Sequence, residues 1–137
     1  MIKFKSFVNE SIRVGRVKRF AAKAHEDWRK TLPANERNVS RERSKNGGPK
    51  ADINVPFDKL HPTAQQENLA SGHAALAAIK KHPKDIEKAS DHVHKEWMKR
   101  NPKTKDNAHQ HIPYNELPED EKEKDRAHVR TMQGIKN

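Results

Sequence analysis

Two histidine–tryptophan pairs are the residues whose types and spacing most invite a chemical interpretation. His25 precedes Trp28, and His94 precedes Trp97, by the same helical spacing, so each imidazole shares a helix face with its indole. An imidazole can act as a general acid or base, but no nucleophile or carboxylate recurs beside both pairs. We therefore expect each histidine to hold an adjoining segment through a ring nitrogen, and we expect the chain not to be an enzyme.

Metal chemistry is the second possibility that the nine histidines raise. Residues two apart on a helix diverge by about 200°, so His92 and His94 cannot chelate one ion together. His109 and His111 could face one side if extended, but a stable site needs a third or fourth ligand. The chain has no cysteine, which excludes thiolate ligands and disulfides. The sequence predicts no metal and no cofactor.

The acidic run from Glu119 to Glu121 could be mistaken for catalytic carboxylates. It follows Pro118, and carboxylates in the first turn of a helix are stabilised by the peptide dipoles, so we interpret the run as a helix start. No glycine-rich loop precedes a helix, so nucleotide hydrolysis has no support in the sequence.

The elements that would position the histidines occur twice and in the same order. Residues 24–30 return as residues 93–99, and Val55–Leu60 returns as Ile112–Leu117. The simplest interpretation is one small domain built from two related halves. The buried core is predicted to contain Trp28, Trp97, His25, His94, Leu60 and Leu117.

The predicted fold is mainly α, with two pseudo-symmetric halves at about residues 16–80 and 84–135 within a domain 16–137. Each half contains a His-x-x-Trp helix, a short extended Pro-aromatic segment and a helix initiated by proline. A basic amphipathic segment, residues 1–15, precedes the domain and is expected to end in a helix break at Gly15. Residues 33–54 are predicted to form a polar connection with a turn at 46–49.

The composition permits only a small core and favours an anionic partner. Hydrophobic residues make up 31% of the chain, charged residues 35%, and the mean hydropathy is -1.22. Residues 1–50 hold 14 Lys and Arg against 5 Asp and Glu, out of a net charge of +10. Such an excess attracts nucleic acid or an acidic protein alike. No stretch is apolar enough to span a membrane, so a soluble protein is expected.

Residues 111–130, together with the His94-x-x-Trp97 helix, resemble the RyR domain, the small repeat of ryanodine receptors and of some bacterial and phage proteins. The likeness covers about residues 20–137 and is most specific in the second half. In the first half, Glu67-Asn68-Leu69 stands where Lys124-Asp125-Arg126 matches the motif. The resemblance implies a compact, mainly helical pair of halves and permits sensing of a nucleotide-derived ligand.

The first ten residues are similar to leaders of T-even-type phage proteins, including capsid-targeting peptides that a prohead protease removes after a glutamate. Phe7-Val8-Asn9-Glu10 fits that pattern. This similarity implies a phage-encoded protein in the host cytoplasm or the virion interior.

Two functions remain open from the sequence. The first is a non-enzymatic binding module whose cleft between halves receives a small anionic ligand or a protein partner. Its candidate ligand-binding residues are Phe57, Tyr114, Arg126, Arg37, Arg41 and Arg43. The second is a basic structural protein that binds nucleic acid without sequence preference. Its candidate contacts are Arg13, Arg16, Lys18 and Arg19.

Overall fold

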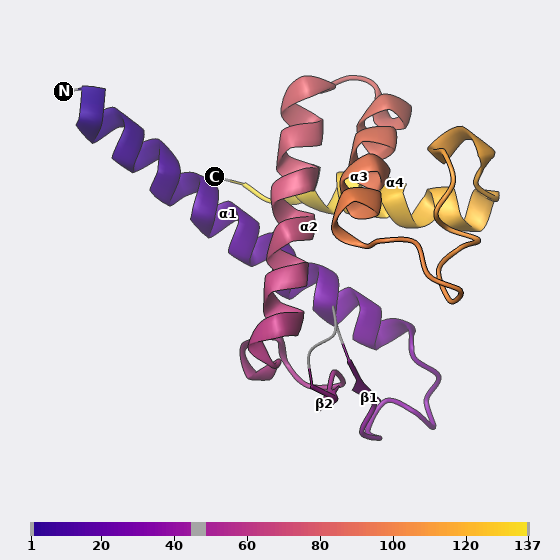
Figure 1. Ribbon diagram of the computed structural model, residues 1–137. Helices are drawn as coiled ribbons and strands as arrows, with labels where there is room; N and C mark the ends of the chain where they lie inside the picture. The colour runs from indigo at the N-terminus through magenta and orange to yellow at the C-terminus, as the bar shows by residue number, and fades with distance from the viewer. Residues whose placement is uncertain (1, 45–48, 137) are drawn as a thin grey trace. The chain divides into compact units, whose positions relative to one another are not determined.

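The computed structural model describes residues 2–44 and 49–136, with side chains from Glu10 onward. These residues form four α-helices, two 3-10 turns and one two-stranded hairpin (Figure 1). The predicted mainly helical class is confirmed. Among the described residues, no helix combines the length and the apolar character needed to cross a membrane.

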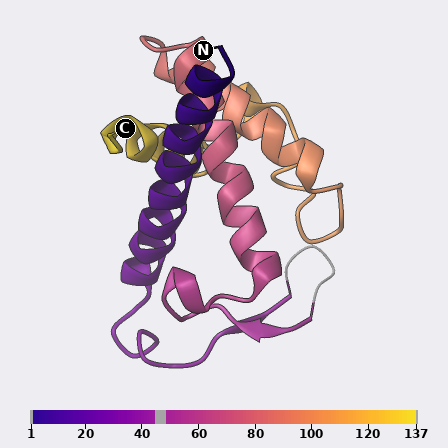
Figure 2. The ribbon, with the colours of Figure 1, turned by 90° about the vertical axis from the view of Figure 1, so that its left-hand side faces the viewer.

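The chain divides into two compact units. Unit 1 comprises Met1–Ala70 and Ile135–Asn137, and unit 2 comprises Ser71–Gly134. The division falls inside helix α2 (Pro62–Lys81), which is continuous through it (Figure 2). The compact units therefore separate earlier in the chain than the repeat pattern, which places the boundary after residue 80.

Helix α1 (Ile2–Thr31) is one continuous helix of 30 residues, so the predicted helix break at Gly15 is wrong. A single glycine inside a helix costs about 1 kcal/mol relative to alanine, which is too little to stop a long helix. The same helix joins the segment 1–15 to the residues that follow. Val17, Phe20, Ala21 and His25 form its buried stripe at helical spacing.

The connection after α1 contains an antiparallel hairpin that the sequence does not predict. Strand β1 (Glu42–Arg43) pairs with strand β2 (Ala51–Asp52). The Asp52 carboxylate accepts hydrogen bonds from the backbone N–H groups of Arg41, at 2.8 Å, and Asn54, at 2.9 Å. These two hydrogen bonds lower the pKa of Asp52 below its usual range. The turn predicted at 46–49 lies, except for Pro49, outside the described residues.

Unit 2 is built on helix α3 (Ile86–Arg100), which packs against helix α4 (Glu119–Gly134) and the 3-10 turn η2 (Tyr114–Glu116). The side chain of Asp85 caps α3 by accepting a hydrogen bond from the Lys88 backbone N–H at 3.1 Å. The buried helix residues of unit 2 come from α2, α3 and α4. They are Gly72, Ala74, Ala75, Leu76, Ala78, Ala89, Ser90, Val93, His94, Val129 and Met132.

Candidate functional site

The two histidines make the same contact in the two units. His25 Nε2 donates a hydrogen bond to the Val55 carbonyl at 2.7 Å, and His94 Nε2 donates to the Ile112 carbonyl at 2.7 Å. Both imidazoles are buried. Each therefore ties its helix to the extended segment before the Pro-aromatic pair, which is the structural role that the sequence suggests.

Each imidazole also stacks on the indole three residues later. The ring centroids are 5.6 Å apart for His25 and Trp28, and 5.8 Å apart for His94 and Trp97. The indoles themselves are only half-buried, although they were expected in the core. Their outer surroundings differ, because Arg41 lies 6.0 Å from the Trp28 ring and His111 lies 6.0 Å from the Trp97 ring.

The Pro-aromatic segments have the same backbone geometry. The turn η1 (Phe57–Lys59) follows Pro56 at φ −55° and ψ 153°, and η2 follows Pro113 at φ −55° and ψ 146°. Each turn ends at a buried leucine, Leu60 or Leu117, whose N–H donates to the carbonyl of the aromatic residue. The two copies of the sequence pattern therefore form the same backbone hydrogen bond at the end of their turns.

The second copy adds a carboxylate to its histidine. Asp125 Oδ2 lies 3.4 Å from His94 Nδ1, and both groups are well covered. Burial alone lowers the pKa of His94, but the hydrogen bonds to Asp125 and to the Ile112 carbonyl outweigh it and raise the pKa above its usual range. Counted from the aligned leucines, Asn68 stands where Asp125 does in the first copy.

Tyr114, Glu87 and Arg126 form a second polar cluster in unit 2. Arg126 donates two hydrogen bonds to the Glu87 carboxylate, from Nε and Nη2, each 2.7 Å long. The buried Tyr114 hydroxyl donates to the same carboxylate at 3.0 Å, and Arg126 Nη1 donates to Glu119 at 2.9 Å. The hydrogen bond from Arg126 is the largest influence on Glu87 and lowers its pKa to about 2.

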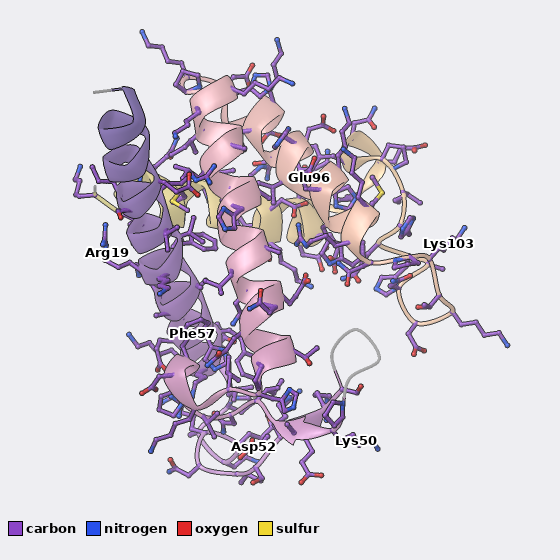
Figure 3. The ribbon with its side chains drawn as sticks, turned by 60° about the vertical axis from the view of Figure 1, so that its left-hand side comes forward. Arg19, Lys50, Asp52, Phe57, Glu96 and Lys103 are labelled. Atoms are coloured by element: carbon purple, nitrogen blue, oxygen red, sulfur yellow. The ribbon has the colours of Figure 1, made fainter. Side chains whose placement is uncertain are left out.

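Unit 1 replaces every member of that cluster. Lys18 stands in the register of Glu87, Phe57 in that of Tyr114, and Leu69 in that of Arg126. Acid, hydroxyl and guanidinium are lost together, so the cluster behaves as one unit that only the second copy carries. Figure 3 labels Phe57, whose turn contacts α1.

The arginines proposed for ligand binding are engaged with their own chain. Arg37 Nε donates to the Leu32 carbonyl at 3.0 Å, at the end of α1, and Arg41 lies over Trp28. Arg43 is exposed in β1 and donates to the neighbouring Glu42 carbonyl at 2.7 Å. Arg126 belongs to the cluster with Glu87. The structure does not gather these four arginines into one site within either unit.

Asn54 is an organising residue that sequence reasoning missed. Its buried side-chain amide donates to the carbonyls of Arg37 and Val39, both at 2.9 Å, and accepts a hydrogen bond from Arg29 Nε at 3.1 Å. One asparagine therefore holds the connection that follows α1. Its place directly before Val55, where the second copy has His111, is the only signal of this role in the sequence.

The basic residues of α1 are partly engaged. Arg16 Nε donates to the Ile135 carbonyl at 2.9 Å, and Arg19 donates to the Lys136 carbonyl. Arg13 is paired with Glu10. Lys18 is exposed and makes no ion pair with any residue that the structure describes. Figure 3 shows Arg19 on the side of α1.

Each unit has an open hollow in whose lining lysines and arginines outnumber carboxylates. In unit 1, Glu26, Arg29, Lys30 and Arg37 surround about 270 Å³. In unit 2, a groove of about 520 Å³ is lined by Lys81, His82, Lys88, Asp91, His92, Lys95, Glu96 and Lys99. We call the second one the lysine groove. The sequence did not single out its lysines, because they are scattered through two helices that read as ordinary amphipathic segments.

Within the described part of the chain, no three His, Asp or Glu side chains converge as metal ligands. His111, one of the two histidines considered for metal binding, donates a hydrogen bond from Nε2 to the Asn101 carbonyl at 3.0 Å.

Comparisons with family models, with curated proteins and with solved structures find no match.

Proposed function

We propose that the chain is a non-enzymatic, RyR-like binding module for a small anionic ligand, with nucleotide-derived phosphates as the first class to test. The observation that carries this proposal is the charge around the two hollows. The hollow of unit 1 has three cationic side chains against Glu26, and the lysine groove has four lysines against Asp91 and Glu96. An anion gains favourable electrostatic energy at either place.

A non-enzymatic role is supported by the way unit 2 uses its reactive groups. His94 directs Nε2 to a carbonyl and Nδ1 to a carboxylate, so neither ring nitrogen is available to take a proton from a substrate. Glu87 is held by Arg126 and Tyr114 and stays ionised, which removes it as a general acid near neutral pH.

The resemblance of residues 111–130 to the RyR domain supports the same assignment. Asp125 and Arg126, which carry part of that resemblance, stabilise unit 2 through His94 and Glu87. On this proposal they support the scaffold of a binding protein, and the ligand contacts come from the cationic hollows. A phage-encoded module of this kind would act in the host cytoplasm.

Thermal-shift measurements on the full chain test the proposal. Inorganic phosphate, pyrophosphate, nucleotides, dinucleotides and cyclic oligonucleotides would be compared at matched ionic strength with sodium chloride and with an uncharged nucleoside. We expect stabilisation by phosphates beyond the salt control, because a ligand that binds the folded state raises the melting temperature. Equal shifts in phosphate and chloride would refute the anionic ligand. Stabilisation by an acidic peptide alone would indicate a protein partner instead.

A second candidate is sequence-independent binding of nucleic acid, which the charge of unit 1 favours. Unit 1 holds 16 Lys and Arg against 8 Asp and Glu, which gives a net charge of +8. Unit 2 holds 13 Lys and Arg against 11 Asp and Glu, which gives a net charge of +2. A packaged protein of this kind would lie in the virion interior. Its signature is an affinity for duplex DNA that falls steeply with salt and is equal for unrelated sequences. A flat salt dependence argues against it.

A further inference from the structure

The lysine groove lies in unit 2, where α2 ends and α3 follows it. Lys81 and His82 come from the end of α2 and the residue after it, and the other lining residues come from α3. Lys88, His92, Lys95 and Lys99 are spaced by four, three and four residues, so they share one face of α3. Figure 3 shows Glu96, another lining residue, on this helix.

The carboxylates of the groove are already neutralised. Asp91 pairs with Lys95 at 2.9 Å, and Glu96 pairs with Lys99 at 3.1 Å. Lys81 and Lys88 make no ion pair with any residue that the structure describes. The groove therefore carries two positive charges in excess even when both its histidines are neutral.

The groove favours the neutral form of His92. Burial is the largest influence and lowers its pKa, Glu96 opposes that shift, and Lys81, His82 and Lys99 lower the pKa further. A neutral imidazole keeps one N–H donor, which an anion in the groove can accept.

The lining also limits what kind of anion fits. No Trp, Tyr or Phe lines the groove, so the aromatic faces that it offers to a nucleobase are only the two imidazoles, which are smaller than an indole, a phenol or a phenyl group. Lysine binds phosphate as a point charge and does not require the planar, two-pronged geometry that arginine gives a carboxylate. Two unpaired lysines match the double charge of one phosphate group.

We propose that the lysine groove is a phosphate-binding site that recognises the phosphate group of a small soluble compound and not its base. Lys81 and Lys88 supply the charge, and His82 and His92 supply N–H donors. This inference rests on the proposed function, since it names the place and the chemical class of the anionic ligand.

Isothermal titration calorimetry of the full chain with pyrophosphate, at constant ionic strength, tests the groove. The double variant Lys81→Ala/Lys88→Ala should bind pyrophosphate at least about tenfold more weakly than the wild type, because it removes two charge-assisted contacts. The matched control is Lys103→Ala/Lys105→Ala, which loses the same charge from exposed residues on the loop after α3 (Figure 3). That control should retain wild-type affinity within about twofold, since neither lysine lines the groove and exposed charges are screened by salt.

Each of three other results would contradict the proposal that the lysine groove binds phosphate. Equal affinity of the wild type and Lys81→Ala/Lys88→Ala, with folding confirmed by circular dichroism, would place the phosphate elsewhere and leave the anionic-ligand function standing. A nucleotide that binds far more tightly than pyrophosphate would show a site that reads the base. No phosphate binding by the wild type would remove the groove and the proposed function together.

Discussion

The second ring nitrogen of His94 faces a carboxylate. In both units Nε2 carries the hydrogen that is donated to a carbonyl. For His94, Nδ1 faces the Asp125 carboxylate, which can only accept, so this environment favours the doubly protonated imidazolium. The first copy has Asn68 in the register of Asp125, and an amide does not impose that requirement. A single carboxylate thus gives the histidine of the second copy a charged partner.

This difference predicts a pH-dependent loss of stability in Asp125→Asn. The folded-state pKa of His94 is raised above its unfolded value of 6.5. The stabilisation is therefore fully present below that value and is lost as the pH rises through the folded pKa. The free energy of unfolding should differ more between wild type and Asp125→Asn at about pH 6 than at about pH 8.5. Urea denaturation at both pH values measures it.

The matched control for this prediction is Asp106→Asn, which removes the same charge from an exposed loop residue. Its difference from the wild type should be small and nearly constant over the same pH range. A difference between wild type and Asp125→Asn that grows with pH would contradict the proposed role of the pair. Burial lowers the pKa of His92, which has no contact with Asp125, so the subtraction removes its contribution. Burial also lowers the pKa of His128, and Asp125 opposes that shift, so His128 adds to the difference between wild type and Asp125→Asn with the same sign as His94.

At the level of elements, the sequence predicts what short local signals determine. Proline before an aromatic residue sets the extended segment and the following turn, and the His-x-x-Trp spacing places both rings on one helix face. Both signals depend on neighbours in sequence, and both are present twice in the structure. Each histidine also forms a hydrogen bond to a carbonyl much later in the chain. This contact could be predicted because the helix and the extended segment recur in the same order.

The connection after α1 could not be predicted in the same way. Its order depends on Asn54, whose amide reaches carbonyls 15 and 17 residues earlier, and on Asp52, which accepts from backbone N–H groups. Polar residues in a polar stretch show no periodicity. The sequence therefore does not distinguish a residue that orders the loop through hydrogen bonds from a neighbour that only contacts solvent. The lysine groove was missed for a related reason, because its charges gather only after α2 and α3 fold.

The continuity of α1 predicts that Gly15→Ala stabilises the protein. A methyl group at this position would meet Arg19 Nη1 at 3.4 Å, which is the movable end of a flexible side chain. Alanine should therefore gain about 0.5–1 kcal/mol in the free energy of unfolding, largely by reducing the freedom of the unfolded chain. Thermal denaturation followed by circular dichroism measures the gain.

A second substitution at the same residue provides the control. Gly15→Pro should lower helix content and stability, since proline removes a backbone donor and clashes with the preceding turn. If Gly15→Ala instead destabilised the protein, α1 would not be a continuous helix in solution.

At the scale of the whole molecule, the two compact units share helix α2. Ser71 begins unit 2 inside that helix, so unfolding one unit alone would leave half of a 20-residue helix without the contacts of its own unit. Isolated helices of about 10 residues are not stable in water. Because they share this helix, we expect the two units to unfold in one transition.

The chain offers a direct measurement of this coupling, because Trp28 lies in unit 1, Trp97 lies in unit 2, and the protein has no other tryptophan. The variant Trp97→Phe reports on unit 1 by fluorescence, and Trp28→Phe reports on unit 2. In each variant, the urea transition seen by the remaining indole should coincide with that seen by far-ultraviolet circular dichroism, as expected for two-state unfolding. Comparison within one variant avoids the difference in stability between the two substitutions. If each indole instead reported a transition separate from the loss of helix, α2 would not couple the units, and they would fold as independent domains.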